Sequence, residues 1–177
     1  MKSLLLLLFC VPIFAFAQED PASKLGPDPI YVVDSVKITK DQFQNFNVST
    51  VASVQVLTDA DATNKFGNIA RDGAILIQTK ALARRIYIRY FRKKSPAYDS
   101  LYMAAKTDSA FQYIINDKIK DQNSEGDLSA INDKLFISLE ILTADDLKKK
   151  YNITDKLVGV LIKCRKPQDV FNGDSKF

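Results

Sequence analysis

The chain has 177 residues, two cysteines, no histidine and a formal net charge of +4 at pH 7. The lack of histidine excludes Ser-His-Asp and Cys-His catalysis, a histidine general base and zinc sites of the usual His-containing kind. A charge this mild does not predict a polyanion as the main partner, and this length suits one medium domain or two small ones.

Residues 1–17 have the pattern of a secretory signal peptide. Lys2 supplies a positive charge, residues 4–14 are apolar, and Ala-Phe-Ala at 15–17 has the small-x-small pattern of a cleavage site. The apolar run has about 11 residues, whereas a membrane-spanning helix needs about 20. We therefore expect cleavage after position 17 and a location in the periplasm or on the periplasmic face of the outer membrane. Lipidation of Cys10 is the alternative.

The expected cleavage leaves Cys164 as the remaining thiol. No intramolecular disulfide can then form, even in an oxidising compartment. A cysteine nucleophile needs a base, and the chain has no histidine to act as one. We therefore interpret Cys164 as a buried or half-buried structural thiol.

Two segments are predicted to lack regular structure. Residues 18–29 hold three prolines and show no apolar periodicity, which predicts a flexible tether. Residues 167–177 are expected to form a loose tail.

The first folded domain is predicted at 30–81. It begins with the β-rich run Ile-Tyr-Val-Val at 30–33, which ends in Asp-Ser. An alternating strand follows around 54–56, and Gly-Ala-Ile-Leu-Ile at 73–77 is typical of a well-buried strand.

A short helix is predicted between the second and third of these strands. Thr58 and Asp61 fit a capping box, in which a Thr hydroxyl and a carboxylate three residues later satisfy free amides at the helix start. The helix is expected to run to Phe66. Gly67 then lies where a left-handed C-cap favours a residue without a Cβ.

The same order recurs in the second half of the chain, which predicts an internal duplication. Residues 139–143 match residues 54–58, and Thr143 and Asp146 form a second capping box. Asn152 takes the place of the C-cap glycine, since asparagine also tolerates positive φ.

Two further matches extend the duplication. Tyr-Ile-Ile-Asn at 113–116 corresponds to Tyr-Val-Val-Asp at 31–34, and the glycine of 159–162 is matched with that of 73–76. One short insertion in the second copy accommodates the different spacing.

Residues 30–80 carry a more specific pattern. They read Tyr-Val-Val-Asp-Ser at 31–35, Val-Ala-Ser-Val-Gln-Val-Leu-Thr at 51–58, Phe-Gly at 66–67 and Gly-Ala-Ile-Leu-Ile-Gln-Thr-Lys at 73–80. In order and spacing this segment resembles the plug domain of TonB-dependent receptors, especially the starch-utilisation type of Bacteroidetes. Residues 113–166 resemble the same unit more remotely.

The chain also departs from that family. Ser35, Thr58 and Phe66 stand where the family has glycine, lysine and tyrosine, and residues 18–29 do not look like a TonB box. A receptor barrel has on the order of 22 strands of about 10 residues, for which the residues after Lys80 are too few. The resemblance therefore implies a fold and an envelope setting, but not transport.

Few residues suggest chemistry. Asp59, Asp61, Asp145 and Asp146 could be proposed as catalytic or calcium-binding carboxylates, but their positions at helix starts are explained by capping. The glycines do not form a phosphate-binding loop. We therefore expect a protein that is not an enzyme and has no catalytic, cofactor or metal site.

The basic and aromatic segment 84–94 is interpreted as a strand added to the second domain, 82–166. Ser95 and Pro96 then begin an added helix, as N-cap and first residue. One face of the strand is a candidate interaction face for an acidic partner or an anionic glycolipid, while nucleic acid is not expected in this compartment. A solvated outer face is the alternative. The face consists of Arg85, Tyr87, Arg89, Phe91 and Lys93.

The sequence thus predicts an α+β protein of two small plug-like units, each a mixed sheet with short helices. The predicted function is a non-catalytic binding or scaffolding module for an envelope protein partner. The alternative is a periplasmic protein that binds a ligand or glycan in the cleft between its two halves.

Overall fold

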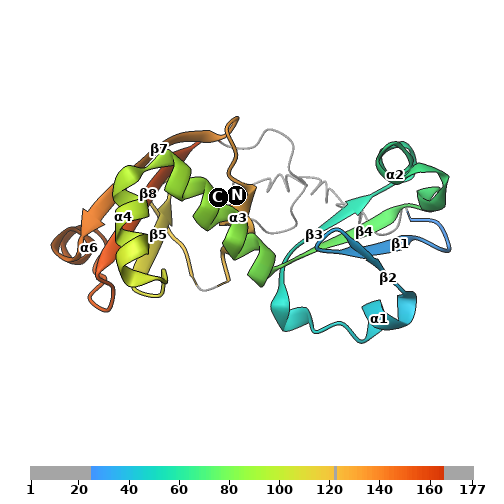
Figure 1. Cartoon of the computed structure of the whole chain (residues 1–177), viewed down its shortest axis with the longest axis horizontal. Coiled ribbons are helices and arrows are strands. Elements are labelled where there is room, and N and C mark those ends of the chain that lie inside the picture. Colours follow the sequence, from blue (N-terminus) through green and yellow to red (C-terminus); the bar gives the residue numbers. More distant parts are fainter. Residues whose placement is uncertain (1–24, 122, 166–177) are drawn as a thin grey trace, which may run out of the picture.

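The computed structural model describes residues 25–121 and 123–165, and they form two four-stranded mixed sheets with several short helices (Figure 1). This confirms the predicted α+β class and the two small units. The predicted signal peptide and tail lie outside the described residues. Within the described ranges, no helix combines the length and the apolar character that a membrane crossing requires.

The first unit has the sheet order β2-β1-β4-β3. The pairs β1–β2 and β3–β4 are antiparallel, and the central pair β1–β4 is parallel. Two 3-10 turns, Val48–Thr50 and Gly67–Ala70, accompany the main elements. These are β1 (Ile30–Val33), β2 (Val36–Ile38), α1 (Lys40–Gln44), β3 (Val51–Leu57), α2 (Asp59–Phe66) and β4 (Ala74–Thr79).

The second unit repeats this architecture with the order β6-β5-β8-β7. Its central pair β5–β8 is again parallel and its outer pairs are antiparallel. The elements follow one another as in the first unit, so the predicted equivalence of the upstream strands is confirmed. They are β5 (Phe111–Ile115), β6 (Lys118–Ile119), α5 (Glu125–Ala130), β7 (Phe136–Thr143), α6 (Ala144–Tyr151) and β8 (Val158–Cys164).

The first hairpin turn is alike in both units. Asp34 and Ser35 have φ of 49° and 74°, and Asn116 and Asp117 have φ of 48° and 66°. Two successive residues of positive φ suit the twist of a two-residue hairpin. Ser35, which replaces the glycine of the plug pattern, therefore occupies a position that favours glycine.

A hydrogen bond from the turn to the central strand is also repeated. The Asp34 carboxylate accepts from the Thr79 backbone N–H at 2.8 Å and from the Thr79 hydroxyl at 2.6 Å. In the second unit, Asn116 Oδ1 accepts from the Cys164 backbone N–H at 3.0 Å. The last residue of the Tyr-Val-Val-Asp motif therefore fixes the end of the neighbouring parallel strand in both copies.

The cores beneath α2 and α6 match closely, with one correction to the predicted alignment. Leu57 pairs with Ala74 and Leu142 pairs with Gly159, so Gly159 corresponds to Ala74 and not to Gly73. The two glycines have different roles, because Gly73 is a turn residue with φ of 95°, whereas Gly159 lies inside a strand. A Cβ at position 159 would lie 2.7 Å from Leu147 Cδ2, so the helix packs close to the strand.

Helices α3 (Lys80–Lys94) and α4 (Pro96–Ala105) connect the two units. The prediction of a strand at 84–94 is therefore wrong. The predicted strand began at 84, five residues after the N-cap of the helix. At this cap the Thr79 hydroxyl accepts from Leu82 N–H at 3.2 Å. Ser95 caps α4 and Pro96 follows it, as predicted.

The two units contact each other through α5. Gly126 lies so close to the Ala52 carbonyl that any side chain there would collide with the backbone of β3. The Ser129 hydroxyl donates to Gln78 Oε1 at 2.8 Å, and Lys80 Nζ donates to Asn123 Oδ1 at 2.8 Å. The chain thus brings α5 of the second unit against the sheet of the first.

The end of the predicted tether differs from expectation. Gly26 N–H donates to the Asp72 carbonyl at 2.8 Å, and the Leu25 side chain lies against Gly73. Residues 25–29 therefore lie against the turn before β4, because this turn offers a free carbonyl and a position without a Cβ.

Candidate functional site

One face of the first sheet is apolar and lies opposite α2. Paired residues of neighbouring strands share a face, so the pairs Tyr31–Ile75 and Val54–Ile77 lie on the same side. The core under α2 uses the other residues of these strands, among them Val32. We call the side away from α2 the open face; it consists of Tyr31, Val33, Val36, Ile38, Val54, Val56, Ile75 and Ile77.

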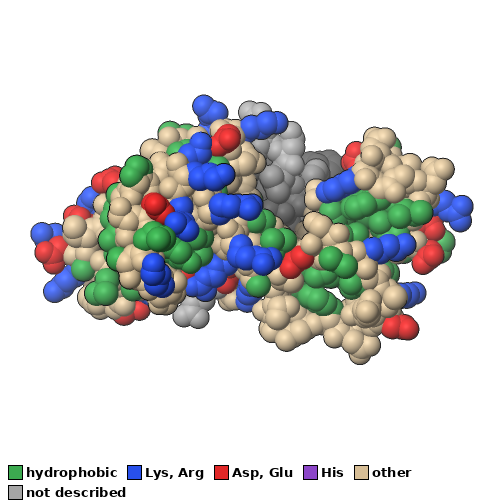
Figure 2. All heavy atoms as spheres, viewed as in Figure 1, with side chains coloured by type: hydrophobic (Ala, Val, Ile, Leu, Met, Phe, Trp, Pro, Cys, Tyr) green, Lys and Arg blue, Asp and Glu red, His purple; other side chains and the backbone are tan. Residues whose placement is uncertain are grey.

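The open face is only partly covered. Val36 is 64% exposed and Val54 is 50% exposed. Tyr31 is half-buried and stacks on Phe43 of α1, with ring centroids 4.3 Å apart. Ile77 is buried. Figure 2 shows hydrophobic side chains gathered over the strands of this unit, at the right of the view.

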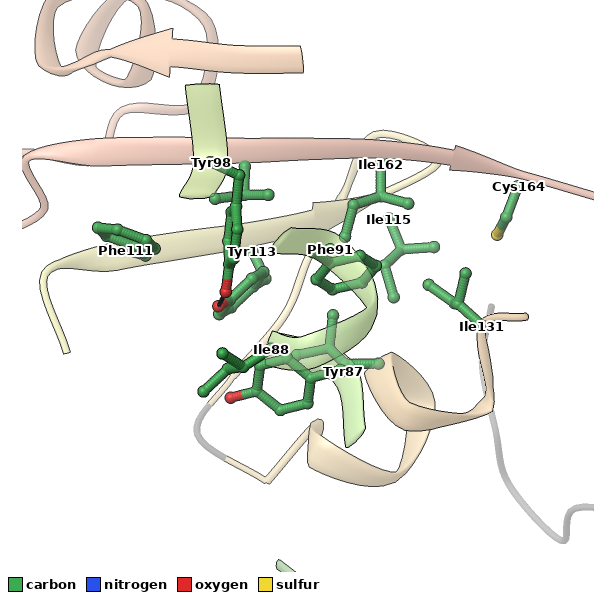
Figure 3. Close-up of a cluster of buried hydrophobic side chains, with 12 residues drawn as sticks. Tyr87, Ile88, Phe91, Tyr98, Phe111, Tyr113, Ile115, Ile131, Ile162 and Cys164 are labelled. Carbon is green, nitrogen blue, oxygen red and sulfur yellow. Dashed lines mark hydrogen bonds between the residues drawn. The ribbon is translucent and has the colours of Figure 1, made fainter. Parts of the chain in front are cut away.

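The equivalent face of the second sheet is buried. Ile115 is 1% exposed, and both Val160 and Ile162 are 0% exposed. Aromatic side chains of α3 and α4 pack on this face, as the close-up in Figure 3 shows. The Tyr87 ring lies edge-on to the Tyr113 ring, with centroids 5.4 Å apart. The connecting helices therefore cover the second sheet.

A buried carboxylate fixes these helices to the sheet. Asp108 accepts hydrogen bonds from the Tyr87 hydroxyl at 2.7 Å and from the Tyr113 hydroxyl at 2.9 Å, and it forms an ion pair with Arg84. The hydroxyls of Tyr98 and Tyr113 are 2.7 Å apart. Burial raises the pKa of all three tyrosines above the ordinary value. They thus remain hydrogen-bond donors, and the cluster holds the cover in place.

No local pattern in the sequence indicated this cluster. Asp108 lies in the loop before β5, far along the chain from Tyr87. The available signal was an acidic loop residue followed five positions later by a strand tyrosine.

The predicted interaction face on 84–94 is corrected by the helix. Tyr87 and Phe91 point into the core and are buried, so they cannot share an exposed face with the basic residues. Arg85, Arg89 and Lys93 are exposed, and their spacing of four places them along one side of the helix. We call these three residues the basic stripe. Figure 2 shows Lys and Arg side chains along the middle of the molecule, where α3 lies.

A shallow hollow adjoins the basic stripe. It encloses about 290 Å³ and is lined by Ile86, Arg89, Tyr90 and Lys93. Two of its walls are therefore cationic and two are apolar or aromatic. The Tyr90 hydroxyl donates to Asp133 Oδ1 at 2.9 Å, which orients the ring.

All the predicted caps are confirmed in the second unit, but not in the first. Thr143 and Asp146 form the capping box: Asp146 N–H donates to the Thr143 hydroxyl at 3.2 Å, and Thr143 N–H donates to Asp146 Oδ2 at 3.1 Å. Hydrogen bonds from Thr143 lower the pKa of Asp146. Asn152 ends the helix in the left-handed conformation, with φ of 57°.

In the first unit the helix begins and ends as predicted, but the capping box is wrong. Thr58 is the N-cap residue and makes no side-chain cap hydrogen bond, so Asp61 is not part of a box. Its φ is −111°, against −74° for Thr143, and this rotation changes the direction of the side chain. Gly67 is the C-cap and has a positive φ of 74°, but its ψ of −168° differs from the left-handed conformation that was predicted.

The described residues offer little chemistry. Between residues 25 and 165, position 122 excepted, no group of three or more acidic, histidine or cysteine side chains could hold a metal ion. Cys164 is buried, and burial raises the pKa of its thiol. A thiol of raised pKa is a poor nucleophile, which agrees with the structural interpretation.

Searches against models of protein families, curated proteins and solved structures found no match to this chain. The open face and the basic stripe are therefore the two features from which a function can be argued.

Proposed function

We propose that the chain is a non-catalytic binding module of the bacterial envelope, with a plug-like first unit that docks an envelope protein partner on its open face. The supporting observation is the comparison within the molecule. The same sheet occurs twice, and its apolar face is covered in one copy and partly exposed in the other. The exposed apolar residues Val36 and Val54 lie on the two edge strands of the sheet, and large exposed apolar patches mark interaction sites.

The second unit indicates which kind of partner fits. Its own face is covered by helices whose aromatic side chains, such as Tyr87 and Phe91, pack on the sheet. Tyr31 occupies in the first sheet the place that Tyr113 occupies in the second. We therefore expect the partner to present a helix with aromatic side chains, because large rings bury much apolar area in one contact.

The envelope setting rests on the signal-peptide pattern and on the plug resemblance of residues 30–80. The positive φ at Ser35 and at Gly67 supports that resemblance, since both are glycine positions of the plug pattern. Mass spectrometry of the native N-terminus tests the setting. A mature chain that begins at Gln18 agrees with export, and an intact Met1 contradicts it.

The alternative function, a ligand held between the two halves, has less support. The units meet in direct contact at Gly126 and Ala52. The hollow described above is lined by residues of α3 alone, and its volume of about 290 Å³ is at the lower end for ligand pockets.

Photocrosslinking tests the open face. A benzoylphenylalanine is placed at Val54 in the envelope of the native host, with a matched control at Ile137, which is 57% exposed on an outer strand of the second unit. We expect one discrete protein adduct from position 54 and none of that size from position 137. Adding Val36→Asp should abolish the adduct, because it places a charge in the docked surface.

The crosslinked peptide of the partner identifies what docks. A peptide from a helix with aromatic residues supports the proposal. The absence of any adduct at position 54, or identical adducts at positions 54 and 137, would contradict it.

A further inference from the structure

The basic stripe on α3 is a second surface and lies on a different element from the open face. Binding at the stripe does not depend on the docking proposed above. We propose that Arg85, Arg89 and Lys93 bind an acidic segment of a partner protein. Carboxylates of that segment pair with the stripe, and a neighbouring apolar side chain enters the hollow beside it.

The stripe carries charge that the described residues leave without an ion pair, although Asp133 interacts electrostatically with Lys93. Helix α3 has seven basic residues and no acidic one. Four of them have polar partners: Lys80 with Asn123, Arg84 with Asp108, Arg92 with Asp99, and Lys94 with Asp133. In the described part of the chain, the three residues of the stripe have no ion-pair partner.

The stripe does little to stabilise the helix, because only Lys93 lies in the last turn, where a cation favours the helix C-terminus. Like charges four residues apart on a helix repel one another and cost some stability. The helix is held by its buried side, where Tyr87 and Phe91 enter the core. The outer side is therefore free to carry charge for an external partner.

The spacing of the stripe fits a peptide. Helix geometry puts successive cations about 6 Å apart, because four residues rise by about 1.5 Å each. Carboxylates four residues apart on an acidic helix have the same spacing. Arg89 and Lys93 also line the hollow with Ile86 and Tyr90, so an apolar side chain can sit between two ion pairs.

A membrane surface fits less well. A basic amphipathic helix binds a bilayer by burying its apolar side among the lipids. The apolar side of α3 is already buried against the second sheet. An anionic bilayer could attract the stripe only through its charge, and the hollow would have no role.

The binding experiment uses residues 18–177 and fluorescence anisotropy at low salt. The probe is a synthetic helical peptide with glutamates at i, i+4 and i+8 and a leucine beside the central glutamate. Two further probes are a peptide of the same composition in scrambled order and vesicles that contain phosphatidylglycerol.

The test variant is Arg85→Gln/Arg89→Gln/Lys93→Gln. The matched control is Lys148→Gln/Lys149→Gln/Lys150→Gln, which removes the same charge from exposed residues of α6. We expect the test variant to weaken binding of the ordered peptide by about tenfold, as three exposed ion pairs allow, and the control to change it little. Circular dichroism should show both variants folded.

A third variant, Ile86→Ala, examines the hollow. This substitution should weaken binding of the leucine peptide and leave binding of a peptide with alanine in that position unchanged. The proposal is overturned if the wild-type chain does not bind the ordered peptide, if both triple variants weaken binding equally, or if only the vesicles bind in a stripe-dependent way. Equal binding of the ordered and scrambled peptides would also overturn it.

Discussion

The two units share one architecture and differ in how each sheet face is covered. Beneath α2 and α6 the cores correspond residue by residue: Val32 with Ile114, Leu57 with Leu142, and Leu76 with Leu161. On the opposite face, α3 and α4 bury the second sheet, whereas the first keeps the open face. A fold can thus be duplicated while one copy is completed internally and the other retains surface for a partner.

The comparison also shows how a duplicated core diverges. The first unit places Ala62 on its helix and Ala74 on its central strand, and the second places Leu147 and Gly159 at the same positions. The larger helix residue is matched by the loss of a Cβ on the strand. Close packing requires such compensation, since added volume in a filled core forces strain.

Alkaline pH should separate the two units most strongly. Tyr87, Tyr98 and Tyr113 have a folded-state pKa raised above the unfolded value of about 10. Their contribution to stability is complete below about pH 10 and falls as the pH rises, by roughly 4 kcal/mol per pH unit for three groups. Denaturant unfolding between pH 8 and 11.5, with tyrosinate absorbance, should show the second unit unfolding first. Ionisation of all seven tyrosines before unfolding would contradict this.

Replacing the buried carboxylate should have the next largest effect. Asp108→Ala leaves the hydroxyls of Tyr87 and Tyr113 and the Arg84 guanidinium without their acceptor, at a cost of about 3–5 kcal/mol. The control is Asp133→Ala, whose side chain is 79% exposed, so its loss should change the free energy of unfolding far less. Urea unfolding measures both changes, and similar midpoints for the two variants would rule out a structural role of the cluster.

A double-mutant cycle tests the compensation between helix and strand. Gly159→Ala alone should cost about 1–3 kcal/mol, because the new Cβ would lie 2.7 Å from Leu147 and 2.8 Å from Leu142. In the Leu147→Ala background the same change should cost much less, since the pair then resembles Ala62 and Ala74. Chemical denaturation of the four proteins gives the coupling energy. A value near zero would mean that the two positions do not compensate.

The smallest effect is expected at the helix caps. Thr143→Ala removes the acceptor of the Asp146 amide and should cost about 0.5–2 kcal/mol. Thr58→Ala should change the free energy of unfolding by less than about 0.5 kcal/mol, because its hydroxyl makes no cap bond. Thermal unfolding of both variants decides the point, and equal losses would restore a capping role for Thr58.

Much of the fold could be predicted because the informative patterns are local. Turn residues, caps and short apolar runs identified the strands at 30–33 and 73–77 and the helices that end at Gly67 and Asn152. The duplication followed from the order of these signals. The one-residue misalignment of Gly159 arose because glycine serves a turn in one copy and close packing in the other.

The site was harder to predict because it depends on tertiary contacts. Residues 84–94 alternate well enough for a strand, and the helix is determined by the cap at Thr79 and by packing on a sheet that follows later in the chain. The basic residues of the interaction face were identified, while Tyr87 and Phe91 were assigned to the wrong side. Asp108 could not be found, since its partners come together only in the fold.

Thiol labelling tests the central claim, one architecture with one covered and one open sheet face. Val54→Cys and Leu139→Cys are made in a Cys164→Ala background; the two positions are equivalent, opposite Ile77 and Ile162. A maleimide should react at position 54 at least about tenfold faster than at position 139, where reaction needs opening of the α3–α4 cover. Equal rates at the two positions would contradict the account.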